Sequence, residues 1–595
     1  MCKTSKLLLG LVLASSLSVA SAKQKIIALQ SLGIRANQAT NTAPRLNFII
    51  DSLKKSQALH DSITLLFTPG TYYFDALGSP EEELYISNHD QTGKRHIGIK
   101  IEGLHHLTLD GMGSEFIFRD RMLPIAIISS KNIFCRGFSV DFTEPQISQV
   151  EIIRNLGKEG MEYRPAPWVK WRINAKNEFE CYGSNWSNTP QSGIVFEPLT
   201  RHTKYRVSDL GFRTNETRAI GANKLYSPHW IDERLSPGDV IAMRSWDRPQ
   251  PAIFIDASQD SKLENISIHY ADGMGLLAQN SHNLSLNRFC VARRGEYDPR
   301  LFTTQADATH FSGCSGHISV RNGLFEHMMD DAINVHGVYL KMTKRIDDYT
   351  VEGQYMHNQA WGFEWGRQGD SVQFIYSKTF DSHKGYNVIQ SIEPIGQPTV
   401  KGAKIFRIKF KQKLAHNLTP ENSIGLENMR KIPSVSFTGN TIRNNRARGA
   451  LFNTSKSVLV EGNYFDHISG AAIVSSTDCN QWFESGQTQS ILIRGNIFND
   501  VLTSLYQFTE AVICLHPVIP ELSKQRTPFY GKGTSGITIE DNIFQTFDTP
   551  LLYALSTQGI LWQRNLLIKT QTYPQYHWNQ ERYKLIGCKD ISIKD

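Results

Sequence analysis

Aspartate, histidine and asparagine residues are concentrated between positions 307 and 337, where one heptad pattern occurs twice. The pattern Asp-Ala-Xaa-His/Asn-Xaa-Xaa-Gly begins at Asp307 and again at Asp331, after 24 residues, and Asp330 directly precedes the second copy. A repeat of this length is typical of one coil of a β-solenoid. Three carboxyl groups should therefore lie close together, at equivalent positions of two successive coils.

A cluster of this kind suits acid–base chemistry. Strands of neighbouring coils lie about 4.8 Å apart, and carboxylates at that spacing resist ionising together, which raises at least one pKa. In glycoside hydrolysis one carboxylic acid protonates the leaving oxygen while carboxylates activate water, with roughly 6.5–9.5 Å between the groups in inverting enzymes. Stacked acids would be too close for this. Asp330 and Asp307 form a diagonal pair that could open to the required gap, with Asp307 and Asp331 sharing the water.

Short strands that end in asparagine recur in the second half of the chain and indicate the scaffold. The asparagines are spaced by 23, 33, 46 and 23 residues, where 46 is two periods and 33 is one period plus a ten-residue loop. A period of roughly 20–25 residues with strands of four to six residues is typical of a parallel β-helix. We therefore expect an all-β fold, a right-handed parallel β-helix in which stacked asparagines hydrogen-bond along the coils. The asparagines are Asn440, Asn463, Asn496, Asn542 and Asn565.

The same repeat aligns the acidic residues with one another. Asp272 and Asp307 each lie 15 residues before an asparagine of the repeat, so we expect them at equivalent positions of successive coils. Together with Asp331 they would form a column, with Asp330 beside it. Two alternatives stay open, because Asp272 alone is typical of an Asx turn and a column of acids could hold calcium.

Two long blocks interrupt the coil period, and each is rich in short strands and turn residues. Loops of this size on a solenoid usually gather on one face and form the walls of a binding site. We interpret both blocks as small inserted β-barrel domains. The expected divisions are a signal peptide (1–22), an N-terminal cap with first coils (23–143), inserted barrel 1 (144–250), coils carrying the active site (251–340), inserted barrel 2 (341–430) and C-terminal coils (431–595). Within the cap, the segment 45–59 is expected to be a helix that covers the first coil.

The first 22 residues have the pattern of an export signal. Lys3 and Lys6 precede an apolar run from Leu7 to Val19, and small residues follow it. The run is too short for a comfortable membrane span, so we expect an exported protein, periplasmic or secreted, without a membrane partner. The net charge of +7 is spread along the chain, which argues against nucleic acid as a partner.

Polar residues around the acids are candidates for contacts with a sugar. We predict substrate binding by His310, Asn334, His336, Asp272 and Arg448, although the histidines and Asn334 could equally be hydrogen-bonded residues of the coil stack. No metal-ligand pattern or cofactor motif is evident, so we expect neither a metal nor a cofactor.

Other residues could act on the same site. Arg446 follows the second insertion and could neutralise the acids or bind substrate. Trp361, Trp365 and Trp482 could stack on a sugar face, but aromatic residues inside a barrel more often belong to its core.

The chain resembles glycoside hydrolase family 110, the exo-acting α-galactosidases that cleave terminal α-1,3-linked galactose. The resemblance lies in the phrases ADATHFSG and MMDDAINVHG, the two strand-rich insertions and the exported β-helix. It implies an inverting mechanism without a metal, with Asp330 as general acid and with Asp307 and Asp331 as the base pair that positions water. It also implies a homodimer and a glycan substrate with terminal α-galactose, either the blood-group B structure or linear α-1,3-galactosides. The proton on the general acid should be retained near neutral pH by its acidic neighbours.

Three other functions stay open at this point. Polygalacturonase-type enzymes share the double aspartate and would act on another galactose-containing or anionic polysaccharide. A non-catalytic glycan-binding β-helix would have no reason to concentrate acids. A calcium-dependent polysaccharide lyase would need a Lys or Arg base, which cannot be placed in this stretch.

Overall fold

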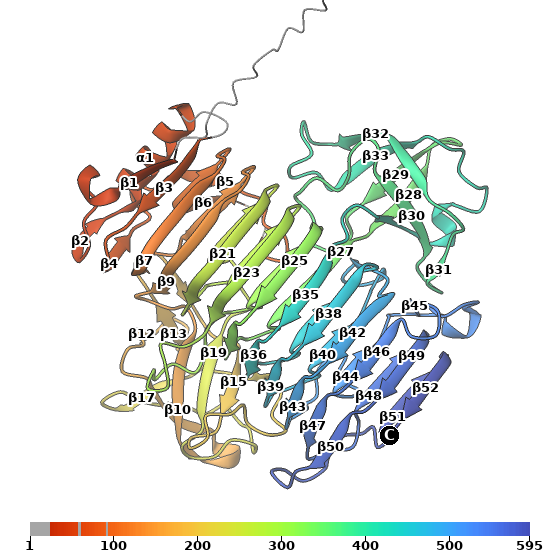
Figure 1. The fold of residues 1–595 in the computed structure, drawn as a ribbon. Helices are drawn as coiled ribbons and strands as arrows, with labels where there is room; N and C mark the ends of the chain where they lie inside the picture. Colours follow the sequence, from red (N-terminus) through yellow and green to blue (C-terminus); the bar gives the residue numbers. More distant parts are fainter. Residues whose placement is uncertain (1–23, 57–60, 91–92) are drawn as a thin grey trace, which may run out of the picture.

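The computed structural model describes residues 24–56, 61–90 and 93–595. Most of this chain winds into one stack of coils, from which two smaller β units project (Figure 1). The expected all-β class, a parallel β-helix with two inserted β-barrel domains, is confirmed. The predicted signal peptide lies outside the described residues. Within the described ranges, no helix is long and apolar enough to cross a membrane.

The coils are built from two long parallel sheets. The 13-stranded sheet carries the site and contains β5 (Glu81–Glu83), β6 (Lys94–Glu102), β8 (Leu123–Ile128), β20 (Ile253–Asp256), β22 (Leu276–Gln279), β24 (Thr309–Ser312), β27 (Ile333–Val338), β37 (Ala450–Phe452), β40 (Ile473–Ser475), β44 (Ile513–Leu515), β48 (Leu552–Leu555) and β51 (Tyr583–Ile586), with β41 (Glu484–Ser485) paired to β27. The 22-stranded sheet contains β1 (Gln24–Ala28), β2 (Gln38–Asn41), β3 (Ser62–Leu66), β4 (Thr71–Phe74), β7 (Leu107–Phe118), β9 (Phe134–Phe142), β21 (Gln259–Ile268), β23 (His282–Val291), β25 (Ser315–Arg321), β26 (Leu324–Glu326), β35 (Ser434–Thr438), β36 (Thr441–Arg443), β38 (Ser457–Glu461), β39 (Tyr464–Asp466), β42 (Ser490–Arg494), β43 (Ile497–Asn499), β45 (Tyr530–Gly531), β46 (Ile537–Glu540), β47 (Ile543–Thr546), β49 (Thr557–Gln563), β50 (Leu566–Lys569) and β52 (Lys589–Lys594).

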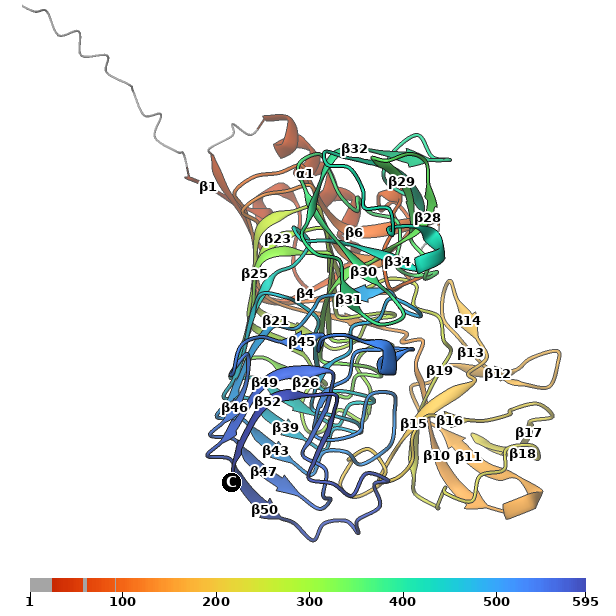
Figure 2. The same ribbon diagram turned by 90° about the vertical axis from the view of Figure 1, so that its right-hand side faces the viewer.

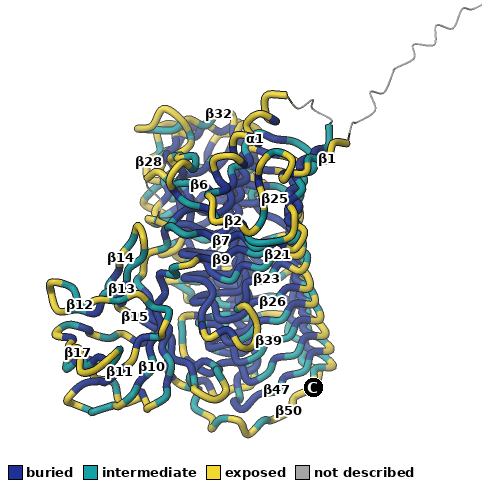
Figure 3. The backbone as a smooth tube through the Cα atoms, turned by 90° about the vertical axis from the view of Figure 1, so that its left-hand side faces the viewer, coloured by how far each residue is buried: buried dark blue, intermediate teal, exposed yellow. Residues whose placement is uncertain are grey.

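The 24-residue heptad repeat corresponds to one coil. β24 pairs in parallel with β27, and Thr309 lies opposite Ile333. Alternate residues of the coil strands point inward, so the interior is a continuous apolar core, which Figure 3 shows as the buried centre of the stack.

Asparagine side chains form a ladder on the C-terminal coils, as predicted. The side-chain Nδ2 of Asn440 donates to Oδ1 of Asn463 at 3.0 Å, and Asn463, Asn496 and Asn542 each donate to the next asparagine at 2.9 Å, ending at Asn565. Each amide also donates to a backbone carbonyl of a neighbouring coil. The ladder satisfies buried polar groups at the same turn of these C-terminal coils.

An α-helix covers the first coils. Helix α1 spans Ala43–Ser56 and buries Leu46, Ile49, Ile50 and Leu53 against the end of the core. The predicted capping helix is therefore present, although it begins two residues earlier than expected. The other helical elements of the described residues are the 3₁₀ helices η1 (Leu29–Leu32), η2 (Gly157–Glu159), η3 (Pro420–Asn422) and η4 (Leu522–Lys524).

The two inserted domains are antiparallel and have cores of their own. Barrel 1 contains β10 (Ser148–Asn155), β11 (Met161–Pro165), β15 (Ser192–Phe196), β16 (Leu210–Gly211), β17 (Arg218–Gly221), β18 (Lys224–Ser227) and β19 (Val240–Arg244), with a small sheet of β12 (Trp171–Ile173), β13 (Phe179–Tyr182) and β14 (Ser187–Asn188). Barrel 2 contains β28 (Leu340–Arg345), β29 (Thr350–Gln354), β30 (Ser371–Tyr376), β31 (Asp381–Ser382), β32 (Asn387–Ile395), β33 (Ile405–Phe410) and β34 (Ile424–Asn428). Both project from the same side of the coil stack (Figure 2).

Candidate active site

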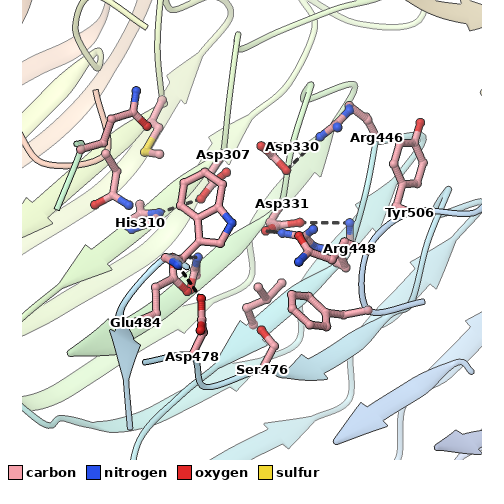
Figure 4. A pocket seen from close by; sticks show the side chains of 18 of the residues that line it. Asp307, His310, Asp330, Asp331, Arg446, Arg448, Ser476, Asp478, Glu484 and Tyr506 are labelled. Atoms are coloured by element: carbon pink, nitrogen blue, oxygen red, sulfur yellow. Dashed lines mark hydrogen bonds and ion pairs between the residues drawn. The ribbon is translucent and has the colours of Figure 1, made fainter. Parts of the chain in front are cut away.

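A cavity of about 420 Å³ lies where the coils meet segments from both insertions. The coils contribute acidic and basic side chains, and the walls come from five other parts of the chain, at Asn88, 246–248, Gln359, 476–484 and 506–508. Figure 4 shows the acids and arginines at its centre. Its lining includes Asn88, Trp246, Arg248, Asp307, His310, Asp330, Asp331, Asn334, Gln359, Arg446, Arg448, Asp478, Trp482, Glu484 and Tyr506.

Asp307, Asp330 and Asp331 meet on one wall of this pocket. Because Thr309 is level with Ile333, Asp307 and Asp331 each lie two residues before the strand at the same position of successive coils. One carboxylate oxygen of each acid lies within 4.8 Å of the others. Asp330 adjoins Asp331 in the chain, so its carboxyl group stays near both of the other acids. The nearest oxygens of Asp330 and Asp307 are therefore closer together than the roughly 6.5–9.5 Å expected from the sequence.

Asp272 does not belong to this column, and the predicted position was wrong. Strand pairing sets Leu276 opposite Thr309, so Met274, not Asp272, is level with Asp307. Asp272 is buried beside Tyr270 and Gln146 instead, where burial raises the pKa of its carboxyl to about 6. It does not line the pocket.

An extra residue inside a strand and an offset between the two asparagines explain this error. Eleven residues separate Leu276 from Asn287, whereas 13 separate Thr309 from Asn322. Strand pairing sets His282 opposite Ser315 but Leu284 opposite Ile318, so β25 contains one extra residue. The same pairing sets Asn287 opposite Arg321, so Asn322 lies one residue further along, although its Nδ2 still donates to Oδ1 of Asn287 at 3.1 Å. These two shifts together misplace Asp272 by two when positions are counted from the asparagine.

Asp330 is held between two arginines. Its carboxylate accepts from Arg248 at 3.0 Å and from Arg446 at 3.2 Å. Burial opposes ionisation of Asp330, but the guanidinium groups of Arg446 and Arg248 outweigh it and lower the pKa of this carboxyl. The expectation that acidic neighbours raise the pKa of Asp330 is therefore wrong for this arrangement of the site.

Asp331 is bound by Arg448 at both oxygens. The backbone N–H of Arg448 donates to Oδ1 at 3.0 Å, and the guanidinium donates to Oδ2 at 2.9 Å. Burial nevertheless raises the pKa of Asp331. Arg448, predicted to contact sugar, lines the pocket and also anchors this acid.

Asp307 is paired with a histidine rather than with an arginine. Its Oδ2 lies 2.7 Å from Nδ1 of His310. Burial, followed by the charge of Asp330, raises the pKa of Asp307 to about 8. In this arrangement the carboxyl groups of Asp307 and Asp331 are therefore the protonated ones, and Asp330 is the charged member of the three.

The predicted polar contacts divide into two groups. His310 and Asn334 line the pocket, whereas His336 lies behind His310, with the two Nε2 atoms 2.8 Å apart. Nδ2 of Asn334 donates to Glu484 at 3.5 Å. His310 and Asn334 can reach a bound sugar, and His336 can act only through His310 or Glu484.

Two sets of donor atoms are close enough together to be considered for a metal. In the first, Nε2 of His310 and Nε2 of His336 lie 2.8 Å apart beside Glu484. Two zinc–nitrogen bonds of about 2.0–2.1 Å at a tetrahedral angle would span roughly 3.3 Å, so this contact has the geometry of a hydrogen bond. The second set is the three aspartates, of which Asp330 and Asp331 are already paired with arginines and Asp307 with His310. Neither set fits a metal as it stands.

Sequence reasoning missed the residues that reach the pocket from other parts of the chain. Arg248 and Trp246 come from the end of insertion 1, and Glu484 and Asp478 from a loop between coils. Their positions follow no repeat, so no sequence signal identified them. Trp482 lines the pocket with 37% of its surface exposed.

The other two tryptophans considered for sugar stacking are not at the site. Trp361 and Trp365 are buried in the core of barrel 2. They follow the usual behaviour of aromatic residues inside a barrel.

Comparison with known proteins adds to this geometry. Family models described as GLAA-B beta-barrel domain I and GLAA-B beta-barrel domain II match residues 148–241 and 350–424. An Alpha-1,3-galactosidase B of Phocaeicola vulgatus is 47% identical over 576 residues, which cover 97% of this chain and 95% of the relative. The chain belongs to the alpha-1,3-galactosidase family.

Other comparisons agree with membership of the alpha-1,3-galactosidase family. An Alpha-1,3-galactosidase B of Bacteroides fragilis is 45% identical over 588 residues, which cover 99% of both chains.

Among solved structures, an exopolygalacturonase of Yersinia enterocolitica is 10% identical, covering 97% of this chain and 80% of that one, with a TM-score of 0.36. That likeness is too distant to bear on the chemistry of the site.

Proposed function

We propose that this protein is an exo-acting, inverting α-galactosidase of glycoside hydrolase family 110 that hydrolyses terminal α-1,3-linked galactose. The observation that carries the proposal is the meeting of Asp307, Asp330 and Asp331 in a walled pocket of a chain whose relatives are named Alpha-1,3-galactosidase B. Three carboxyl groups of unequal pKa supply both an acid and a base for glycoside hydrolysis.

In this proposal Asp330 protonates the leaving oxygen, and Asp307 and Asp331 position and deprotonate water. Exposure supports the assignment, because 12% of the Asp330 side chain is accessible, against 5% for Asp307 and 2% for Asp331. The three acids titrate as one coupled system. The reactive form is then the arrangement in which one of their protons lies on Asp330, a minor population before substrate binds.

Two features support inversion. Both oxygens of Asp331 accept hydrogen bonds from Arg448, and Oδ2 of Asp307 contacts His310, so these carboxylates are held as water-binding groups rather than as free nucleophiles. Two bases on successive coils can orient one water molecule between them.

Exo action is supported by the walls of the pocket. Asn88, Trp246, Gln359 and Trp482 surround the acids from four separate segments. Walls on several sides suit the end of a glycan better than the middle of a polymer. The two tryptophans offer apolar faces on which a sugar ring can stack.

One assay tests the reaction. The protein is incubated with blood-group B trisaccharide, with linear α-1,3-galactobiose and with polygalacturonate, and the first anomer released is followed by NMR. We expect galactose from at least one of the first two, initially as the β-anomer. Initial α-galactose would refute inversion, and release from polygalacturonate alone would favour the polygalacturonase-type alternative.

We also propose that the protein acts outside the cytoplasm. Support comes from the charged, apolar and small-residue segments of positions 1–22. Cell fractionation with and without these residues tests the proposal, and retention of the full chain in the cytoplasm would contradict it.

A further inference from the structure

A chain of close contacts leads from Asp307 away from the reacting centre. Oδ2 of Asp307 lies 2.7 Å from Nδ1 of His310, and Nε2 of His310 lies 2.8 Å from Nε2 of His336. Nδ1 of His336 lies 2.6 Å from the carbonyl oxygen of Gly337, and its Nε2 lies 3.5 Å from Glu484. All of these residues except Glu484 are buried.

Donor and acceptor rules restrict where the hydrogens can be. The carbonyl oxygen of Gly337 can only accept, so Nδ1 of His336 must carry a hydrogen. A neutral His336 then has a bare Nε2, and His310 has to donate to it through its own Nε2. Nδ1 of a neutral His310 is then bare as well, and Asp307 can satisfy it only as a protonated acid.

Ionised Asp307 requires a different arrangement. His310 must then donate through Nδ1, and two neutral rings would place two lone pairs 2.8 Å apart. The contacts are satisfied only when one ring is an imidazolium. Burial lowers the pKa of His310 to about 3, whereas Nε2 of His336 lies beside the carboxylate of Glu484. The charge therefore belongs on His336.

We propose that His310 and His336 form a proton relay that allows Asp307 to ionise by transferring its proton to His336, with Glu484 as the counter-charge. The O–H proton of Asp307 moves to Nδ1 of His310 while the Nε2–H proton of His310 moves to Nε2 of His336, so the number of protons is unchanged. His310 and His336 are positioning residues in this scheme. The inference rests on the proposed function, because it takes Asp307 as a catalytic base.

Other titratable and charged groups face the relay from the surrounding elements: His89, Arg248, Asp330, Arg448 and His357. Two of them are arginines, which oppose a cation on the histidines. Within the described part of the chain, Glu484 is the one acid with an oxygen within 4.0 Å of a His336 ring nitrogen. Glu484 is therefore the group that can stabilise the imidazolium.

The relay predicts how the pH dependence of hydrolysis responds to His336→Gln. The amide introduced by this substitution would donate to His310 but cannot carry a proton charge, so the reactive form of the variant holds one proton fewer than that of the wild type. The pH optimum of kcat/KM should shift upward, on the order of one pH unit as for removal of one close charge, with little change in KM. Glu484→Gln, in a pocket wall, removes a negative charge that raises the pKa of the neighbouring groups, so it should shift the optimum downward by a smaller amount.

His467→Gln is the matched control. His467 is also a mostly buried histidine paired with an aspartate, since its Nδ1 lies 2.6 Å from Asp466, and it does not line the pocket. Its profile should keep the wild-type optimum. An unchanged optimum in both His336→Gln and Glu484→Gln would overturn the relay, whatever their activity. If His336→Gln does not fold, the Glu484→Gln profile decides alone. Absence of galactose release by the wild type would refute the proposed function instead.

Discussion

At the scale of single residues, the three acids should differ in what their loss does to hydrolysis. Asp330→Asn and Asp307→Asn should each lower kcat by roughly 10²–10⁴-fold, the usual contribution of a proton-transfer group, while thermal unfolding and substrate affinity change little. An aryl α-galactoside with a good leaving group should restore the Asp330→Asn variant far more than the Asp307→Asn variant, because only the acid becomes dispensable. Equal restoration of activity in both variants would contradict the assignment of Asp330 as the acid and Asp307 as a base.

The pH dependence of the wild type follows from the same acids. Burial and the charge of Asp330 raise the pKa of Asp307 to about 8. A raised pKa means that the cluster keeps its proton at neutral pH and loses it as the pH rises through about 8. Because the reactive form holds as many protons as the resting form, loss of one removes the reactive form and kcat/KM should fall above this pH. A profile that still rises at about pH 9.5 would contradict this proton requirement.

At the scale of elements, the asparagine ladder is the part of the fold that stability measurements can test. Asn496 receives two hydrogen bonds from Asn463 and donates to Val460 and Asn542, all at 2.9–3.0 Å and mostly buried. Asn496→Ala leaves these partners unpaired, at about 1–3 kcal/mol for each buried group. We expect a loss of unfolding free energy of about 2–4 kcal/mol in denaturant titrations followed by circular dichroism.

A matched change one residue away from the ladder provides the comparison, since Gly323 and not Asn322 is level with Asn440. Asn322→Gly keeps the left-handed backbone, with φ of 57°, and breaks one exposed bond to Asn287. Its effect should stay below about 1 kcal/mol. Equal losses in Asn496→Ala and Asn322→Gly would show that the buried ladder does not hold the coils together.

The coils were predictable because their physics is local. Alternation of apolar residues and asparagine at one turn identify a strand and its end, and a period of 24 residues brings Asp307 beside Asp331. The place of a single extra residue is a different matter. Gly316, with positive φ, lies in β25 where the register shifts between Ser315 and Ile318, and nothing in the repeat reveals this shift, which contributes to the misplacement of Asp272.

At the scale of the whole molecule, the electrostatics of the site depend on segments that the repeat does not relate. The strand-rich blocks could be predicted as insertions, but not which of their side chains return to the acids. Arg248 reaches Asp330 from the end of insertion 1, 82 residues earlier in the chain. This contact is part of what lowers the pKa of Asp330, so sequence reasoning placed the acids together and still misjudged their ionisation.

Insertion 1 should also control catalysis through Asp209. Its carboxylate binds Arg446 at 2.6 and 2.7 Å, and Arg446 reaches Asp330 at 3.2 Å. In Asp209→Asn the guanidinium is released to pair more closely with Asp330, which then holds a proton less well. We expect kcat to fall about tenfold, equivalent to about 1.4 kcal/mol, with KM nearly unchanged. Asp232→Asn breaks a comparable pair with Arg234 in the same domain, outside the pocket, and should leave kcat unaltered. If both substitutions have the same effect on kcat, barrel 1 acts on the site only as a wall.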